Sequence, residues 1–236
     1  RSAGRGGLGA VLGSKKVKAI VIDETGAGKV EIANPEAFMA ANKVFSKALL
    51  DHPVSGQGLA LYGTDVLVNI LNEAGGLPAY NFTGGRIKHN DNISGETMNA
   101  TITERGGEGK VSHGCHKGCV IRCSQWYADK DGKYITSGFE YETIWGLGAD
   151  AGIEDLDAIA YIDRAMDDVG VDSIETAVAV ATAMDGGLIP WGDGKAVLEI
   201  VKDMAKPTPM ARIIAGGAGV VGSLCGLYRK IGRAHV

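Results

Sequence analysis

Three cysteines within a few residues of one another are the strongest sign of chemistry in this 236-residue chain. Cys115, Cys119 and Cys123 are each separated by three residues. Iron–sulfur clusters prefer thiolate ligands, and one short loop supplies three of them at little cost in loop-closure entropy. The spacing therefore predicts a metal-binding loop, with an iron–sulfur cluster on these three thiols.

The same cysteines are also compatible with a zinc site or with plain thiols. A zinc ion held by three thiolates and one imidazole, from His113 or His116, is a direct competitor of the cluster. Free buried thiols or a disulfide are less favoured, because disulfides are rare in the cytoplasm. Cys225 follows much later in an apolar stretch, so we interpret it as a buried thiol rather than a fourth ligand.

A glycine-rich segment opens the chain. Gly4 to Gly9 satisfies the pattern G-x-G-x-x-G, but a dinucleotide site needs a strand before these glycines and a helix after them. Here the clearest predicted strand, Val17 to Ile22, follows the glycines, which argues against a nucleotide-binding dehydrogenase. Bare backbone N–H groups beside Arg5, Lys15 and Lys16 still suit a phosphate or an anionic cofactor.

Helical patterns dominate the remainder. Capping residues and apolar spacing predict seven helices: Asn34 to about Leu50, Thr64 to Gly75, Ser94 to Gly106, Asp155 to Gly170, Asp172 onward, Lys195 to Ala205, and Pro209 to Leu227. In the helix that begins at Asp172, Glu175 occupies the reciprocal position of a capping box. We expect the apolar stripes of Phe38–Leu49 and Leu156–Val169 to face a common core. Apolar residues between Gly106 and Gly138 do not recur with the period of a helix or a strand. This region therefore predicts an irregular ligand-bearing loop, with a hairpin at Asp129–Lys133.

Composition narrows the class of function. The chain has 28 acidic and 24 basic residues, a net charge of −4 and no basic block, so neither nucleic acid nor an anionic membrane surface is an expected partner. No apolar run approaches the roughly 18 residues of a membrane span. We expect a cytoplasmic protein that works on small molecules, and the two ends of the chain indicate an internal piece of a longer protein.

Five stretches in order resemble the aldehyde:ferredoxin oxidoreductase family. They are Arg1 to Ile22, Leu77-Pro78-Ala79-Tyr80-Asn81-Phe82, the cysteine loop, Glu140-Tyr141-Glu142-Thr143 and Asp167-Asp168-Val169-Gly170-Val171-Asp172. The resemblance implies a mainly α fold that is α+β at its N-terminus. Residues 1–33 would end the β-rich first domain, and residues 34–236 would form the mostly helical second domain. The rest of the first domain and the third domain would lie outside this chain.

The same resemblance implies an activity and its cofactors. In that family, two pterins hold tungsten or molybdenum near a 4Fe-4S cluster, an aldehyde is oxidised to a carboxylate, and electrons pass to ferredoxin. The cluster would take Cys115, Cys119 and Cys123 here, with a fourth cysteine in the third domain. A homodimer is a further expectation. The alternative is a self-contained iron–sulfur or zinc module without catalysis of its own.

Matching positions give the expected site residues. Asp167 and Asp172, with Val171 in place of the usual leucine, match a motif that binds pterin. The match to a phosphate- and pterin-binding segment comprises Arg5, Gly6, Gly7 and Leu8. Glu140 or Glu142 matches a carboxylate near the metal, where a raised pKa would suit proton transfer. The cysteine spacing departs from the family's commonest pattern of two and then three residues.

Overall fold

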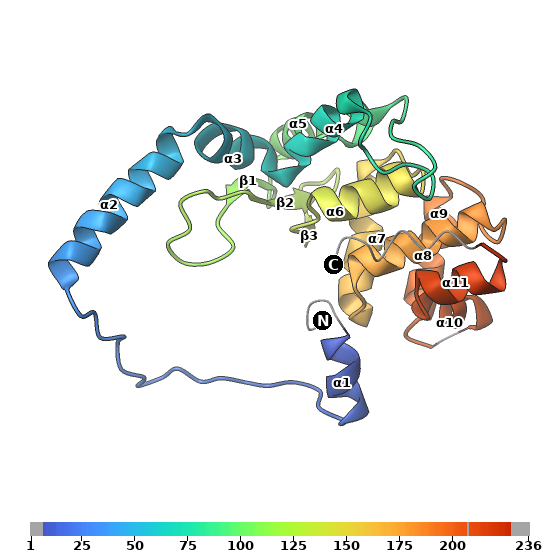
Figure 1. The fold of residues 1–236 in the computed structure, drawn as a ribbon, viewed down its shortest axis with the longest axis horizontal. Helices are drawn as coiled ribbons and strands as arrows, with labels where there is room; N and C mark the ends of the chain where they lie inside the picture. Colours follow the sequence, from blue (N-terminus) through green and yellow to red (C-terminus); the bar gives the residue numbers. More distant parts are fainter. Residues whose placement is uncertain (1–6, 207, 228–236) are drawn as a thin grey trace.

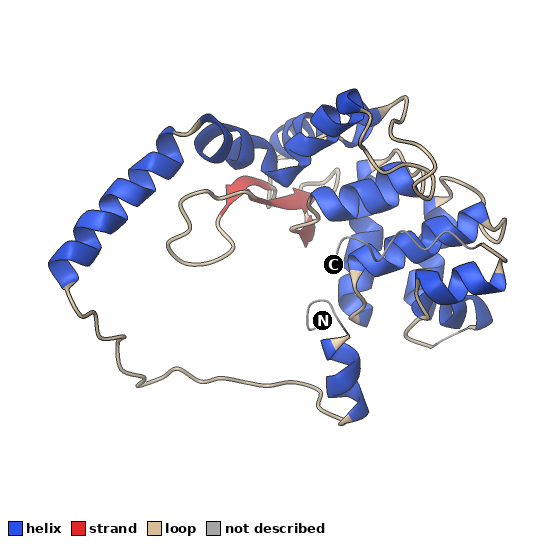
Figure 2. Cartoon of the chain, viewed as in Figure 1, coloured by secondary structure: helices blue, strands red, loops and turns tan. Residues whose placement is uncertain are grey.

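The structure is a computed structural model that describes residues 7–206 and 208–227, and this part of the chain is mainly helical (Figure 2). A three-stranded sheet lies among the helices, and an N-terminal arm leads into a helical body (Figure 1). The mainly α fold class is therefore confirmed. Over the described ranges, no helix is long and apolar enough to cross a bilayer.

The N-terminal arm begins with α1 (Leu8–Ser14) and continues through residues 17–24, which have no regular secondary structure. The strand predicted at Val17–Ile22 is therefore wrong. Ile20, Val21 and Ile22 are 74%, 89% and 86% exposed. A strand is stable only when a neighbouring strand satisfies its backbone groups, and the described residues provide none here.

Helix α2 (Pro35–Asp51) starts as predicted, with the Asn34 side chain accepting a hydrogen bond from Ala37 N at 3.0 Å. Its apolar stripe does not reach the core, however. No residue of α2 is buried, and Phe38 and Phe45 are 53% and 64% exposed. The expectation of a core shared with Leu156–Val169 is wrong, because helical periodicity shows which face is apolar but not what covers it.

The exposure of α2 gives a direct test. We expect Phe45→Ala to change the free energy of unfolding by no more than about 0.5 kcal/mol, as for other surface substitutions. Chemical denaturation of the two proteins would measure it. A loss of roughly 3 kcal/mol or more, typical of a buried phenylalanine, would show that Phe45 packs in the core after all.

A series of short elements joins α2 to the sheet: η1 (Pro53–Gly58), α3 (Leu59–Tyr62), η2 (Gly63–Val66), α4 (Leu67–Ala74), η3 (Asn90–Ile93) and α5 (Gly95–Arg105). Two predicted helices are confirmed among them. The first begins as the 3-10 turn η2 and continues as α4, which ends at Gly75 with a left-handed φ of 75°. The second, α5, begins where Ser94 Oγ accepts from Thr97 N at 3.2 Å.

The sheet is antiparallel, in the order β1 (Lys110–His113), β2 (Ser124–Ala128) and β3 (Tyr134–Ser137). The predicted hairpin at Asp129–Lys133 is confirmed as the turn between β2 and β3, closed by Asp129 N donating to Lys133 O at 2.8 Å. The surrounding region is more regular than predicted, since strands flank the cysteine loop. Helices α5 and α7 pack against the sheet, so the loop projects from a fixed platform.

The helical body comprises α6 (Tyr141–Thr143), η4 (Ile144–Asp150), α7 (Leu156–Val169), α8 (Ser173–Asp185), α9 (Gly194–Asp203), α10 (Pro209–Ala215) and α11 (Ala218–Leu224). Asp155 caps α7, and Gly170 ends it with a φ of 77°, as predicted. The inward stripe of α7 is confirmed for Ile159, Ile162 and Met166, all nearly inaccessible. The core packs α7 against α9, and α8 against η4 and α11.

Two details of this body differ from expectation. The single helix predicted over Pro209–Leu227 is two helices, because Gly217 adopts a φ of 83° between α10 and α11. Asp172 caps α8 as predicted, with Oδ2 accepting from Glu175 N at 2.8 Å. The Glu175 carboxylate, however, accepts from Ala218 N at 3.0 Å and so caps the start of α11. A Cβ on Gly217 would lie 2.5 Å from Glu175 Oε1, which explains the glycine there.

Candidate metal centre and neighbouring carboxylates

The cysteine loop, residues 114–123, connects the end of β1 to the start of β2. Cys115 is exposed, while Cys119 and Cys123 are half-buried, and all three are free thiols. Gly118 and Arg122 adopt left-handed φ values of 85° and 57°, which turn the loop back on itself. The predicted surface-accessible, irregular segment is therefore confirmed.

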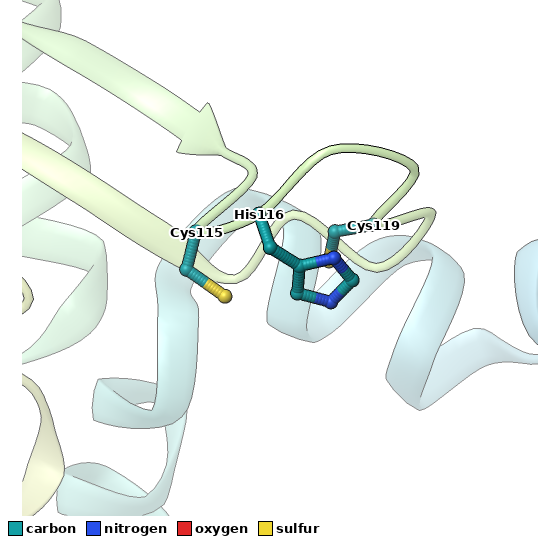
Figure 3. Close-up of side chains that lie close together, drawn as sticks. All are labelled: Cys115, His116 and Cys119. Atoms are coloured by element: carbon teal, nitrogen blue, oxygen red, sulfur yellow. The ribbon is translucent and has the colours of Figure 1, made fainter. Parts of the chain in front are cut away.

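One ligand atom each from Cys115, His116 and Cys119 lies within 4.8 Å of the other two (Figure 3). Cys123 is not a member of this group, so the loop does not gather the three predicted cysteines into one cluster of ligand atoms. The third ligand atom of the group comes from His116, one of the two histidines proposed for the alternative zinc site. The ring of His113, the other candidate histidine, packs against Trp126 with ring centroids 4.9 Å apart.

Cys123 interacts electrostatically with Glu140, which follows β3, as well as with Cys119 and Cys115. Burial raises the pKa of its thiol, and the negative charge of Glu140 raises it further. Glu140 immediately precedes α6, and its Oε2 accepts from Thr64 Oγ1 at 3.3 Å. Thr64 Oγ1 in turn accepts from Tyr141 N at 3.0 Å. These contacts join η2 to α6 and fix Glu140 beside the end of the cysteine loop.

The two predicted catalytic carboxylates have different surroundings. Glu140 is half-buried, and burial raises its pKa, with the charge of Glu142 adding to the effect and the hydrogen bond from Thr64 opposing it. Glu142 is exposed. A half-buried carboxylate with a raised pKa is the better proton acceptor near neutral pH, so the geometry favours Glu140.

Asp65 is a buried carboxylate that was not predicted from the sequence. It has no exposed surface, and neither of its oxygens has a hydrogen-bond partner among the described residues. Burial raises its pKa well above the usual range, and the charges of Glu140 and Glu142 raise it further. Nothing in the stretch Gly63-Thr64-Asp65-Val66 distinguishes it from a solvated helix-start aspartate, so only the tertiary fold reveals it.

The Leu77–Phe82 motif adopts an unusual backbone. Tyr80, Asn81 and Phe82 have consecutive left-handed φ values of 49°, 52° and 58°, a conformation that costs free energy for residues with side chains. Asp150 supports it, because its Oδ1 accepts from Phe82 N at 2.9 Å. Burial raises the pKa of Asp150 to about 7. This second buried carboxylate was also not predicted.

The predicted pterin motif forms the turn between α7 and α8. Asp167 lies in the last turn of α7, Asp172 is the N-cap of α8, and Gly170 between them has the left-handed φ that the turn requires. Both aspartates are half-buried, and Val171 packs against the hydrophobic core. The structure therefore brings the motif's two carboxylates to one turn, while their role toward a pterin stays a prediction.

The predicted glycine segment is only partly described. Arg5 and Gly6 lie outside the described residues. Gly7 is the N-cap of α1 with a φ of 79°, and Leu8 is 60% exposed. The segment therefore leads into a short helix rather than a strand. Its role in binding the same pterin as Asp167 and Asp172 stays a prediction.

Cys225 lies at the end of α11, far across the molecule from the cysteine loop (Figure 1). It packs closely against Gly186, where a Cβ would lie 2.4 Å from its sulfur. Cys225 is half-buried, so it is packed against α8 but is not the fully buried thiol that was predicted.

Comparison with known proteins identifies the relatives of the chain. The family model described as aldehyde ferredoxin oxidoreductase, domains 2 and 3, matches residues 40–233. Tungsten-containing aldehyde ferredoxin oxidoreductases of Thermococcus kodakarensis and Pyrococcus horikoshii are 41% and 43% identical over 78% of this chain. An aliphatic sulfonate oxidoreductase, WOR-like subunit, of Pyrococcus furiosus is 24% identical over 92% of it. The chain spans 29% of the length of the first two relatives and 35% of the third.

Proposed function

Since the chain belongs to the aldehyde ferredoxin oxidoreductase family, we propose that it forms part of an enzyme that oxidises an aldehyde to a carboxylate at a tungsten pterin. Electrons would leave through a 4Fe-4S cluster to ferredoxin. The observation that carries the proposal is the fixed arrangement of the cysteine loop beside Glu140. The names of the relatives favour tungsten over molybdenum.

The residues present suit both cofactors by their chemistry. Cys115, Cys119 and Cys123 offer three thiolates, the donors that iron–sulfur clusters prefer. The carboxylates of Asp167 and Asp172 suit the amino and ring N–H groups of a pterin, since an ionised carboxylate only accepts hydrogen bonds. We also assign Arg5, Gly6, Gly7 and Leu8, together with Val171, to the pterin side of the site.

When bound, the metallopterin supplies the oxygen and electron chemistry. The protein must handle the protons, because converting an aldehyde and water to a carboxylate releases protons as well as electrons. We assign this role to Glu140, whose Oε2 is held by Thr64 and whose pKa is raised by burial. The exposed Glu142 adds negative charge that helps Glu140 keep a proton. Ferredoxin as acceptor, a homodimer and a cytoplasmic location remain predictions.

Metal analysis tests the proposal. The chain would be purified without oxygen, supplied with Fe²⁺ and sulfide, and assayed for iron and visible charge-transfer absorption. We expect iron uptake that Cys115→Ser, Cys119→Ser and Cys123→Ser each reduce strongly and Cys225→Ala leaves unchanged. We also expect less stable clusters than with four thiolates, because the fourth cysteine is predicted outside this chain.

Two outcomes would contradict this assignment. Failure of the unmodified chain to take up iron would show that Cys115, Cys119 and Cys123 do not hold a cluster by themselves, contrary to this expectation. Loss of iron in Cys225→Ala, with the helical circular dichroism intact, would make Cys225 the fourth ligand and favour a self-contained iron–sulfur module. Tungsten in the longer protein that carries this sequence would support the catalytic part of the proposal, and its absence from freshly isolated enzyme would argue against it.

A further inference from the structure

The structure assigns a second metal chemistry to the cysteine loop: we propose that, when no iron–sulfur cluster is present, Cys115, His116 and Cys119 bind a single zinc ion, with water as the fourth ligand. This site is distinct in composition from the proposed cluster site, because it includes His116 and leaves out Cys123. The two states share two thiolates and therefore exclude each other.

The spacing of the ligand atoms favours a single ion. Zinc–sulfur and zinc–nitrogen bonds of about 2.3 and 2.0–2.1 Å place the ligands of a tetrahedral ion roughly 3.5–4 Å apart. The atoms from Cys115, His116 and Cys119 already lie within 4.8 Å of one another, so small side-chain rotations complete the site. A cubane cluster binds each thiolate on a different iron and needs its sulfur ligands farther apart.

A backbone carbonyl lies next to one nitrogen of the His116 ring, as is common in metal sites. Its Nδ1 lies 3.0 Å from Lys117 O, and a carbonyl oxygen only accepts hydrogen bonds. In the tautomer that has the proton on Nδ1, the ring donates to this carbonyl and leaves the lone pair of Nε2 for a metal. A histidine that donates one ring N–H to a backbone carbonyl and offers the other nitrogen is the common arrangement in metal sites. Figure 3 shows its ring on the same side of the loop as the two cysteine side chains.

The backbone also holds the second thiol. Arg122 N donates to Cys119 Sγ at 3.4 Å, which fixes that sulfur within the turn formed by Gly118 and Arg122. The stretch from Lys110 to Cys123 contains basic residues and no acidic one, so the loop has no internal carboxylate to compete with its thiolates for the metal. The site thus combines suitable donors with backbone support for one of its thiols.

Metal titration of the reduced, iron-free chain tests this inference. Cobalt(II) serves as the spectroscopic probe, because a tetrahedral site with thiolate ligands gives intense visible bands and a sulfur-to-cobalt charge-transfer band. We expect binding of one Co²⁺ per chain, displaced by one Zn²⁺. His116→Ala should weaken zinc affinity by more than about 100-fold, since even outer-shell changes cost 10–100-fold. His113→Ala is the matched control and should leave affinity unchanged.

The variants separate this inference from the proposed function. His116→Ala should still take up iron when supplied with Fe²⁺ and sulfide, because the proposed cluster uses only the three cysteines. Unchanged zinc affinity in His116→Ala would overturn the zinc site, as would strong loss in His113→Ala. Loss of zinc binding in Cys123→Ser would also overturn it, by placing the third thiol in the shell. Circular dichroism of each variant would confirm that the fold is retained.

Discussion

Asp157→Ala is expected to lower the free energy of unfolding by roughly 2–3 kcal/mol, less than the roughly 3–5 kcal/mol lost when one partner of a fully buried ion pair is removed, because this pair is half-buried. The Asp157 carboxylate accepts from both terminal nitrogens of Arg105, at 2.6 and 3.0 Å, and from the Tyr127 hydroxyl at 2.7 Å. The two charged side chains are only 16% and 27% exposed. Without the carboxylate, a guanidinium and a buried hydroxyl lose their partner where α5, β2 and α7 meet.

This network also predicts a pH dependence. Burial raises the pKa of Asp157, but the hydrogen bonds from Arg105 and Tyr127 outweigh it and leave the pKa below its usual value. A depressed carboxyl pKa contributes stability above the unfolded-state pKa of about 3.9, and that stability is lost as the pH falls through the folded-state pKa. The difference between the unmodified chain and Asp157→Ala should therefore narrow below about pH 4.

An exposed ion pair provides the control. Asp168 pairs with Arg164 one helical turn away on α7, with the two side chains 59% and 44% exposed. Asp168→Ala should cost no more than about 0.5 kcal/mol, because solvent screens such pairs. Urea denaturation of both variants at neutral and acidic pH measures the contrast. Equal losses in the two variants would show that the Arg105 network is not a buried stabilising unit.

Local signals in the sequence predicted much of the fold. The caps at Asn34, Ser94, Asp155 and Asp172 and the left-handed end at Gly170 all formed where expected. Each depends on a side chain or backbone conformation within a few residues of the helix end. Such interactions are encoded locally, so the order of residues is enough to find them.

Features that depend on distant partners were not predictable in the same way. Residues 17–22 have strand-forming side chains, and α2 has an apolar face, but both are exposed because burial requires a covering surface. The cysteine spacing predicted a metal-binding loop, yet only the loop's conformation shows that a ligand atom of His116 lies near those of Cys115 and Cys119. Asp65 was missed because its burial and its proximity to Glu140 arise from contacts between η2 and α6.

We expect Asp65→Asn to stabilise the chain, in contrast to Asp157→Ala. Asp65 is fully buried without a hydrogen-bond partner among the described residues, and the charged groups that raise its pKa, Glu140 and Glu142, are both negative. Each unit by which the folded-state pKa is raised destabilises the folded state by about 1.36 kcal/mol once the pH exceeds that pKa. Removing the ionisable group should therefore raise the free energy of unfolding at neutral pH by more than the roughly 0.5 kcal/mol typical of a surface substitution.

The pH dependence of this gain identifies its cause. A carboxyl whose folded-state pKa is raised binds a proton that the unfolded chain has already released, so stability falls as the pH rises from about 4 toward the folded-state pKa. This decline is absent in Asp65→Asn. The free energy of unfolding of the variant should therefore exceed that of the unmodified chain by an amount that grows from near zero at about pH 4 to a plateau. Chemical denaturation across this range measures it, with exposed Asp131→Asn expected to stay within about 0.5 kcal/mol throughout.

A destabilising carboxylate beside Glu140 is consistent with a functional role, because residues at working sites commonly lower the stability of the fold that holds them. The negative charge of Glu140 raises the pKa of Asp65, so the ionisation state of Glu140, the proposed proton acceptor, helps decide whether Asp65 holds a proton. Glu140→Gln should therefore lower the pKa of Asp65, measurable by carbon NMR of its side-chain carboxyl. A destabilised Asp65→Asn variant would mean that Asp65 has a stabilising partner, and an unshifted Asp65 in Glu140→Gln would mean that the two carboxylates do not interact.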